Sequence, residues 1–176
     1  MEKITSLFIK IQYALERNNL DILLKVQQIL CLDRILNNQD VLAILPTGFG
    51  KSVIFQLLPF MLERKVLEFP NKIVVVSPLN SIIDDQSTYL KSVGLDVEIL
   101  GTESNDQDLK CLFERNEFKK NSNYVSPKLA SGQVDFIYAH PEGLVSDNGR
   151  KLLLSKPYKD SVIAVVIDEA HCVEFW

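Results

Sequence analysis

The stretch VLAILPTGFGKS, residues 41–52, decides the fold of this chain. Its first five residues form an apolar run that is too short for a helix and fits a strand buried on both faces of a parallel sheet. Glycines at Gly48 and Gly50 follow, and a helical pattern then continues to about residue 64. The glycines allow the backbone to curl so that several N–H groups point at one anion. The sequence therefore predicts a phosphate-binding loop between a buried strand and a helix.

The side chains of this loop suit a nucleotide that carries Mg²⁺. Lys51 can reach the β- and γ-phosphates, and the Ser52 hydroxyl can ligate the metal ion. The full phosphate-loop pattern asks for glycine where this chain has Leu45. An ordinary glycine-rich turn is the alternative interpretation, and the flanking strand and helix argue against it.

A pair of carboxylates ends the most apolar segment of the chain, VIAVVID at 162–168. Charged groups at the end of a buried strand are costly unless they have a partner or a task. Asp168 is placed to hold Mg²⁺ through water, and Glu169 is placed to orient or deprotonate the water that attacks the γ-phosphate. Acidic residues also favour helix N-termini, so the pair gains its meaning from the phosphate loop upstream.

Short apolar runs alternate with helical patterns along the rest of the chain. Further strands are predicted at 72–77, 97–100 and 134–139, and helices at 24–36 and 81–92. This order predicts an α/β fold in which a parallel sheet lies between two layers of helices, with ligands at the carboxyl ends of its strands. The polar segment 102–132 is predicted to be a surface excursion with a short helix near 109–118.

Residues 1–23 are expected to form an N-terminal amphipathic helix region ahead of a partial nucleotide-binding domain, residues 24–176. Apolar residues recur at helical spacing and predict an amphipathic helix over 3–17. Such a helix either docks a partner or packs on its own domain, and the second interpretation is favoured.

Composition excludes several classes of protein. The chain has 176 residues, 47% of them apolar, and carries a net charge of −4, so a broadly basic nucleic-acid-binding surface is not expected. No apolar stretch approaches the ~18 residues of a membrane span, and the N-terminus has no secretory signal. Three cysteines without metal-like spacing fit reduced thiols in an intracellular protein.

Several segments, taken in order, resemble the motif series of superfamily 2 helicases, and RecQ-like DNA helicases in particular. The segments are Leu24-Lys25-Val26-Gln27-Gln28, PTGFGKS (46–52), VSPLNSIIDDQ (76–86), YAHPE (138–142) and IDEAHCVEFW (167–176). The resemblance implies a P-loop NTPase (RecA-like) domain of three α/β/α layers, incomplete at the C-terminus. In the family, the next strand lies between the phosphate-loop strand and the acidic strand. Without it, both strands are expected to present unpaired apolar edges.

The same resemblance implies a role for individual residues, with ATP and Mg²⁺ as cofactors. Gln28 would contact adenine, and His171 would couple the nucleotide site to a second motor domain. The phosphates and Mg²⁺ would be bound by Thr47, Gly48, Gly50, Lys51 and Ser52, together with Asp168 and Glu169. The nucleic-acid strand would be lined, largely through backbone and phosphate contacts, by Ser77, Pro78, Leu79, Tyr138, Pro141 and Glu142, and Trp176 would begin an aromatic-rich loop that senses single-stranded DNA. Departures from the family pattern are Phe49, Asn80, Ile82, Ile83 and His140.

The function implied is that of a 3′-to-5′ ATP-dependent DNA helicase in the nucleus, acting on single-stranded or forked DNA. A second RecA-like domain, missing from this chain, would complete the DNA track and supply an arginine worth roughly 10³–10⁵ in rate. The chain alone is therefore expected to bind ATP and Mg²⁺ and to hydrolyse ATP slowly at best. An RNA helicase of the DEAD/DEAH group and a truncated, non-catalytic nucleotide-binding module are the alternatives.

Overall fold

The computed structural model describes residues 2–62, 68–101 and 126–171. Along the chain the elements are α1 (Glu2–Arg17), α2 (Val26–Leu36), α3 (Lys51–Gln56), α4 (Leu58–Met61), β1 (Lys72–Val76), α5 (Asn80–Ser92), β2 (Val97–Leu100), α7 (Pro127–Ser131), β3 (Phe136–Ala139), α8 (Pro141–Val145), α9 (Asp147–Leu154), α10 (Lys156–Lys159) and β4 (Val162–Ile167). The short helix expected near 109–118 lies outside the described residues, as does Trp176. Within the described part of the chain, no helix is long and apolar enough to cross a bilayer.

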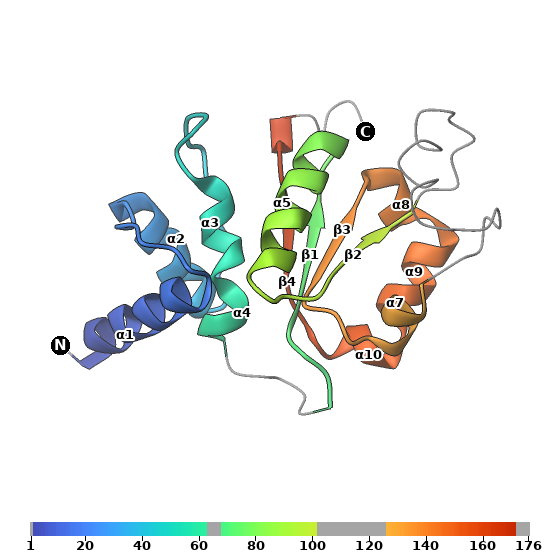
Figure 1. Ribbon diagram of the computed structural model, residues 1–176, viewed down its shortest axis with the longest axis horizontal. Coiled ribbons are helices and arrows are strands. Elements are labelled where there is room, and N and C mark those ends of the chain that lie inside the picture. The colour runs from blue at the N-terminus through green and yellow to red at the C-terminus, as the bar shows by residue number, and fades with distance from the viewer. Residues whose placement is uncertain (1, 63–67, 102–125, 172–176) are drawn as a thin grey trace.

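The sheet has the strand order β2-β3-β1-β4, and every neighbouring pair is parallel (Figure 1). The two central strands, β1 and β3, are buried along their whole length, as expected for short runs of β-branched and aromatic residues. The outer strand β4 is only partly buried. The predicted parallel α/β fold is therefore confirmed, and its strands match four of the five predicted runs.

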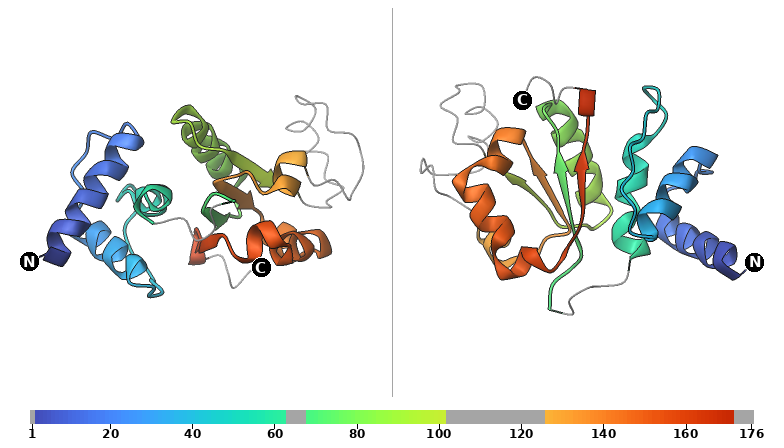
Figure 2. Two further views of the ribbon diagram at one scale, coloured as in Figure 1. Left: turned by 90° about the horizontal axis from the view of Figure 1, so that it is seen from below. Right: turned by 180° about the vertical axis from the view of Figure 1, so that it is seen from behind.

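Alternate residues of β1 enter different hydrophobic clusters on the two faces of the sheet. Ile73 and Val75 pack into a cluster with α1 to α5, whereas Val74 and Val76 pack into a cluster with α7, α9 and α10. Seen from below in Figure 2, α5 lies on one side of the sheet and α9 and α10 lie on the other. The three layers expected from the sequence are present.

The helix predicted at 3–17 is present as α1 and packs into the same core as the sheet. Ile11, Ala14 and Leu15 are buried in the cluster that contains Ile73. The loop that follows α1 is tied to α5, because the Tyr89 hydroxyl donates to the carbonyl oxygen of Asn18 at 3.0 Å. Packing on its own domain is therefore the interpretation of this helix that the structure bears out.

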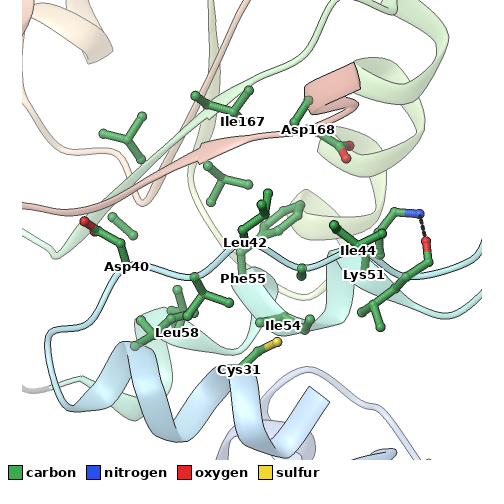
Figure 3. A pocket seen from close by; sticks show the side chains of 18 of the residues that line it. Cys31, Asp40, Leu42, Ile44, Lys51, Ile54, Phe55, Leu58, Ile167 and Asp168 are labelled. Atoms are coloured by element: carbon green, nitrogen blue, oxygen red, sulfur yellow. Dashed lines mark hydrogen bonds between the residues drawn. The ribbon is translucent and has the colours of Figure 1, made fainter. Parts of the chain in front are cut away.

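The predicted strand at 41–45 is absent from the structure. These residues have no strand pairing, and the side chains of Leu42 and Ile44 are 79% and 87% exposed. A strand exists only through hydrogen bonds to a neighbour, and the segment instead faces β4 across a pocket of about 730 Å³ (Figure 3). Across that pocket Val165 and Ile167 of β4 are 61% and 52% exposed. The expected apolar edges are therefore present, although only one of them belongs to a strand.

Candidate functional site

Sequence-distant motifs meet at the carboxyl edge of the sheet because the strands are parallel and in register. Val76 pairs with Ala139 of β3 and with Ile167 of β4. The residues that follow continue the ladder: Ser77 N donates to the Ala139 carbonyl at 3.1 Å, and Asp168 N donates to the Val76 carbonyl at 2.9 Å. The ends of three predicted motifs therefore lie side by side.

The phosphate loop closes as a turn directly ahead of α3. Gly48 and Gly50 have φ values of 75° and 86°, the left-handed region that favours glycine. Lys51 is the first residue of α3, and its Nζ donates to the carbonyl oxygens of Leu45 and Pro46 at 3.3 and 3.5 Å. These hydrogen bonds to the loop carbonyls are long and weak. The ammonium group is therefore held near the loop and can exchange these bonds for bonds to a phosphate.

Gln28, which is predicted to contact adenine, forms hydrogen bonds within the protein in this structure. Its side chain is 4% exposed, and its Oε1 accepts from Lys25 N at 2.7 Å. Its Nε2 donates to the carbonyl oxygens of Phe49 and Gly50 at 3.2 and 3.0 Å. Both amide hydrogens are therefore occupied by the phosphate loop, and a contact with adenine would require these bonds to be exchanged. In this structure Gln28 caps α2 and clamps the loop.

A neighbouring contact reinforces the clamp. The Lys25 ammonium lies 4.0 Å from the centroid of the Phe49 ring and donates to the Phe49 carbonyl at 3.2 Å. Phe49 is one of the departures from the family pattern, and its ring supplies the cation–π partner of Lys25.

The Ser52 hydroxyl is bonded to a side chain that was not among the predicted site residues. Gln86 of α5 donates from Nε2 to Ser52 Oγ at 3.1 Å and accepts at Oε1 from the Tyr138 hydroxyl at 2.8 Å. Burial, and secondarily the charge of Asp168, raise the pKa of Tyr138 far above its ordinary value, so the phenol stays protonated and can donate. The only signal for Gln86 in the sequence was its place at the end of the motif 76–86.

The acidic strand end brings its two carboxylates to the same pocket as Lys51, as Figure 3 shows for Asp168. Asp168 Oδ1 accepts from Glu169 N at 3.0 Å, and within the described residues its carboxylate forms no ion pair. Glu169 has a φ of 53°, a conformation that costs about 1 kcal/mol or more for a residue with a side chain and is often found at functional sites. Its Oε2 lies 3.2 Å from Nδ1 of the exposed His171.

The donor set fits Mg²⁺. Ser52 offers a hydroxyl oxygen and Asp168 an unpaired carboxylate, and this ion prefers oxygen ligands and keeps several waters. Among the described residues no group of three or more metal-ligating side chains occurs. The ion would therefore be held by one or two protein oxygens together with nucleotide phosphates, which is the usual arrangement in nucleotide-hydrolysing sites.

The residues predicted to line nucleic acid separate into buried and exposed sets. The side chains of Ser77 and Tyr138 are fully buried in this structure, so neither side chain is accessible to a nucleic-acid strand. Leu79 and Glu142 are exposed near the same sheet edge. His140 Nε2 and Asn80 Oδ1 are hydrogen-bonded to each other, and this bond joins the residue after β3 to the first residue of α5. Both residues are departures from the family pattern.

Comparison with known proteins fits this geometry. Residues 25–176 match the family model described as DEAD/DEAH box helicase. This chain belongs to the DEAD/DEAH box helicase family.

Relatives of this helicase-family chain cover most of its length. It is 33% identical over 145 residues to the probable ATP-dependent DNA helicase RecS of Bacillus subtilis, which is 82% of this chain and 24% of the relative. It is 29% identical to the ATP-dependent DNA helicase RecQ of Haemophilus influenzae over 80% of this chain and 19% of the relative. It is 26% identical to the putative ATP-dependent RNA helicase R290 of Acanthamoeba polyphaga mimivirus over 81% of this chain and 22% of the relative. The helicase-family chain therefore spans about a quarter or less of each relative.

Proposed function

We propose that this chain is the ATP-binding half of a RecQ-like, ATP-dependent DNA helicase. Two observations carry the proposal: Lys51 and Asp168 share a pocket, and the neighbouring Ser52 is hydrogen-bonded to the helix that covers the sheet. Lys51 and Asp168 line the same pocket, and Ser52 is linked through Gln86 to Tyr138, whose pKa is raised by burial and, to a smaller extent, by the charge of Asp168. An amine, a hydroxyl and a carboxylate so arranged suit a nucleoside triphosphate with its metal ion.

Each residue has a distinct task in this proposal. The Lys51 ammonium would leave the loop carbonyls and bind the β- and γ-phosphates, and Ser52 Oγ and Asp168 would hold Mg²⁺. Bound Mg²⁺ would neutralise the charge that develops on the phosphate oxygens. Glu169 accepts a proton from, or orients, the attacking water. His171, which lies against Glu169, is placed to pass the state of the nucleotide to a second motor domain.

The nucleic-acid track in this proposal runs along the exposed residues at the carboxyl edge of the sheet. Leu79 and Glu142 are exposed there, and Pro78 and Pro141 are half-buried beside them. DNA is favoured as the substrate because RecS and RecQ, at 33% and 29% identity, carry names that specify DNA, whereas the relative named for RNA is 26% identical. The 3′-to-5′ polarity, the second RecA-like domain and the nuclear location belong to the same proposal and rest on the motif resemblance.

Nucleotide binding by the 176-residue chain is the first test. A fluorescent ATP analogue with Mg²⁺ is expected to bind the wild type and not Lys51→Ala, while Lys91→Ala, an exposed lysine on α5, should bind like the wild type. Equal binding by all three proteins would refute the assignment of the phosphate loop.

Turnover distinguishes the half-motor from its alternatives. The 176-residue chain should hydrolyse ATP slowly, with no stimulation by DNA, because none of the described residues that line the pocket is an arginine that could reach the γ-phosphate. Brisk DNA-stimulated hydrolysis by the chain alone would contradict this assignment, and binding without any hydrolysis would favour a non-catalytic module. Strand displacement by a longer gene product on matched DNA and RNA duplexes would separate a DNA helicase from an RNA helicase.

A further inference from the structure

The Ser52 hydroxyl ends a chain of hydrogen bonds that begins at the carboxyl end of β3. Tyr138 donates to Gln86 Oε1 at 2.8 Å, and Gln86 Nε2 donates to Ser52 Oγ at 3.1 Å. The three residues are far apart in sequence and come from β3, α5 and α3. The sheet and the helix that covers it are therefore what bring them together.

Tyr138 fixes the first bond of this chain. Its side chain is fully buried, and a buried hydroxyl without a partner would be costly, so the bond to Gln86 is strongly favoured over an open state. With Oε1 turned toward Tyr138, the amide nitrogen of Gln86 is turned toward Ser52. An amide nitrogen only donates, so Ser52 Oγ is the acceptor in this arrangement.

This direction matters for a metal ligand. A serine oxygen has two lone pairs and one proton. When one lone pair accepts from Gln86, the other stays available for a cation, and the proton is free to donate to a phosphate oxygen. A hydroxyl held in this way has little rotational freedom to lose when the ion arrives, and preorganisation of this kind increases affinity.

We infer that Gln86 and Tyr138 are positioning residues that hold the Ser52 hydroxyl in the orientation that ligates the Mg²⁺ of a bound Mg-nucleotide. The inference rests on the proposed nucleotide-binding function. Neither residue touches the nucleotide. Both act only through Ser52, so their effect must be confined to the part of the nucleotide affinity that depends on the metal ion.

The chain offers a matched control for Tyr138. Tyr158 is also fully buried, and its hydroxyl donates to the Leu129 carbonyl in the cluster on the opposite face of the sheet. Tyr138→Phe and Tyr158→Phe each remove one buried hydrogen bond and keep the ring. Both should lower the melting temperature, and only the first removes a bond that leads to Ser52.

The experiment measures the affinity of the 176-residue chain for a fluorescent ATP analogue, once with Mg²⁺ and once with EDTA. The ratio of the two dissociation constants gives the gain that the metal ion supplies. Gln86→Met and Tyr138→Phe are expected to lower this gain about fivefold, the fold-change that corresponds to about 1 kcal/mol for one hydrogen bond. The affinity in EDTA should stay at the wild-type value, as should both affinities of Tyr158→Phe.

A double-mutant cycle with Ser52→Ala separates positioning from general loosening of the site. In the Ser52→Ala background, Tyr138→Phe should cause no further loss of the metal-dependent gain, because the group it positions is gone. An unchanged gain in both Gln86→Met and Tyr138→Phe, with a wild type that binds in a Mg²⁺-dependent way, would overturn the inference and leave the proposed function standing. A wild type that binds no nucleotide would overturn both. A circular dichroism melt of each variant confirms that the compared proteins are folded.

Discussion

Gly50→Ala and Gly48→Ala should differ sharply in cost, although both glycines lie in the phosphate loop with positive φ. A β-carbon at Gly48 would meet nothing within 4 Å, whereas one at Gly50 would lie 2.8 Å from Gln28 Nε2. Both substitutions place a side chain in the left-handed region, which costs about 1–2 kcal/mol. Only Gly50→Ala must also push Gln28 away.

The additional cost follows from what Gln28 does. Its Nε2 donates to the carbonyls of Phe49 and Gly50, and each hydrogen bond contributes about 1 kcal/mol. The Gln28 side chain can move, so the steric overlap is relieved cheaply, and the lost bonds set the difference. Gly48→Ala is therefore expected to lower the free energy of unfolding by about 1 kcal/mol and Gly50→Ala by about 3 kcal/mol.

Urea unfolding followed by circular dichroism measures these losses directly. In a Gln28→Ala background the clamp is already gone, so the extra cost of Gly50→Ala over Gly48→Ala should disappear. Equal costs for the two substitutions in the wild-type background, or a difference that persists without Gln28, would refute the reasoning that Gln28 clamps the loop.

Further predictions concern the rest of the fold. Burial lowers the pKa of Lys72 to about 8 from 10.5, with Asp135 opposing the shift, so the folded protein releases this proton before the unfolded chain does. The free energy of unfolding of the wild type should therefore rise relative to that of Lys72→Met as the pH rises from about 8 to 10.5 in urea titrations, by up to about 3 kcal/mol; a difference that stays constant with pH would contradict this. Gly149→Ala should lower the urea midpoint, because its β-carbon would lie 2.3 Å from the Gly143 carbonyl oxygen and overpacking against backbone costs about 1–3 kcal/mol; a wild-type midpoint would show that α8 and α9 can separate freely. Val165 lies on the exposed, unpaired edge of β4, and such edges favour association between chains. Val165→Lys should therefore self-associate less than the wild type in sedimentation experiments, and equal association of the variant and the wild type would show that this edge is not involved.

Much of the fold could be predicted from local pattern alone. Runs such as 72–77 and 134–139 are apolar, β-branched and short, and β1 and β3 lie within them. Their burial on both faces follows from the same pattern, because only a strand covered by helices on each side tolerates an unbroken apolar run. The glycines of the phosphate loop were predictable for a similar reason, since few residues other than glycine adopt the positive φ that the turn requires.

The run 41–45 shows where local pattern fails. It is as apolar as β1, yet it forms no strand, because a strand is defined by a hydrogen-bonded neighbour, and that neighbour can belong to any part of the chain. The unpaired apolar edge was expected from the motif resemblance. What the tertiary structure added is that residues 41–45, which face β4 only across a pocket, do not form a strand at all.

The residues of the site divide in the same way. Lys51, Ser52 and Asp168 predicted a nucleotide site from the sequence, because the side chains that bind phosphate or metal are recognised within each short motif. The roles of Gln28 and Gln86 were decided by tertiary structure alone. A glutamine amide can donate and accept hydrogen bonds in many directions, and the neighbouring residues in the sequence do not indicate its partners. Gln28 bonds to the carbonyls of the phosphate loop, whereas Gln86 bridges Tyr138 and Ser52. Hydrogen-bond partners across a fold are fixed by where the backbone carries each group, which depends on the packing of the whole domain.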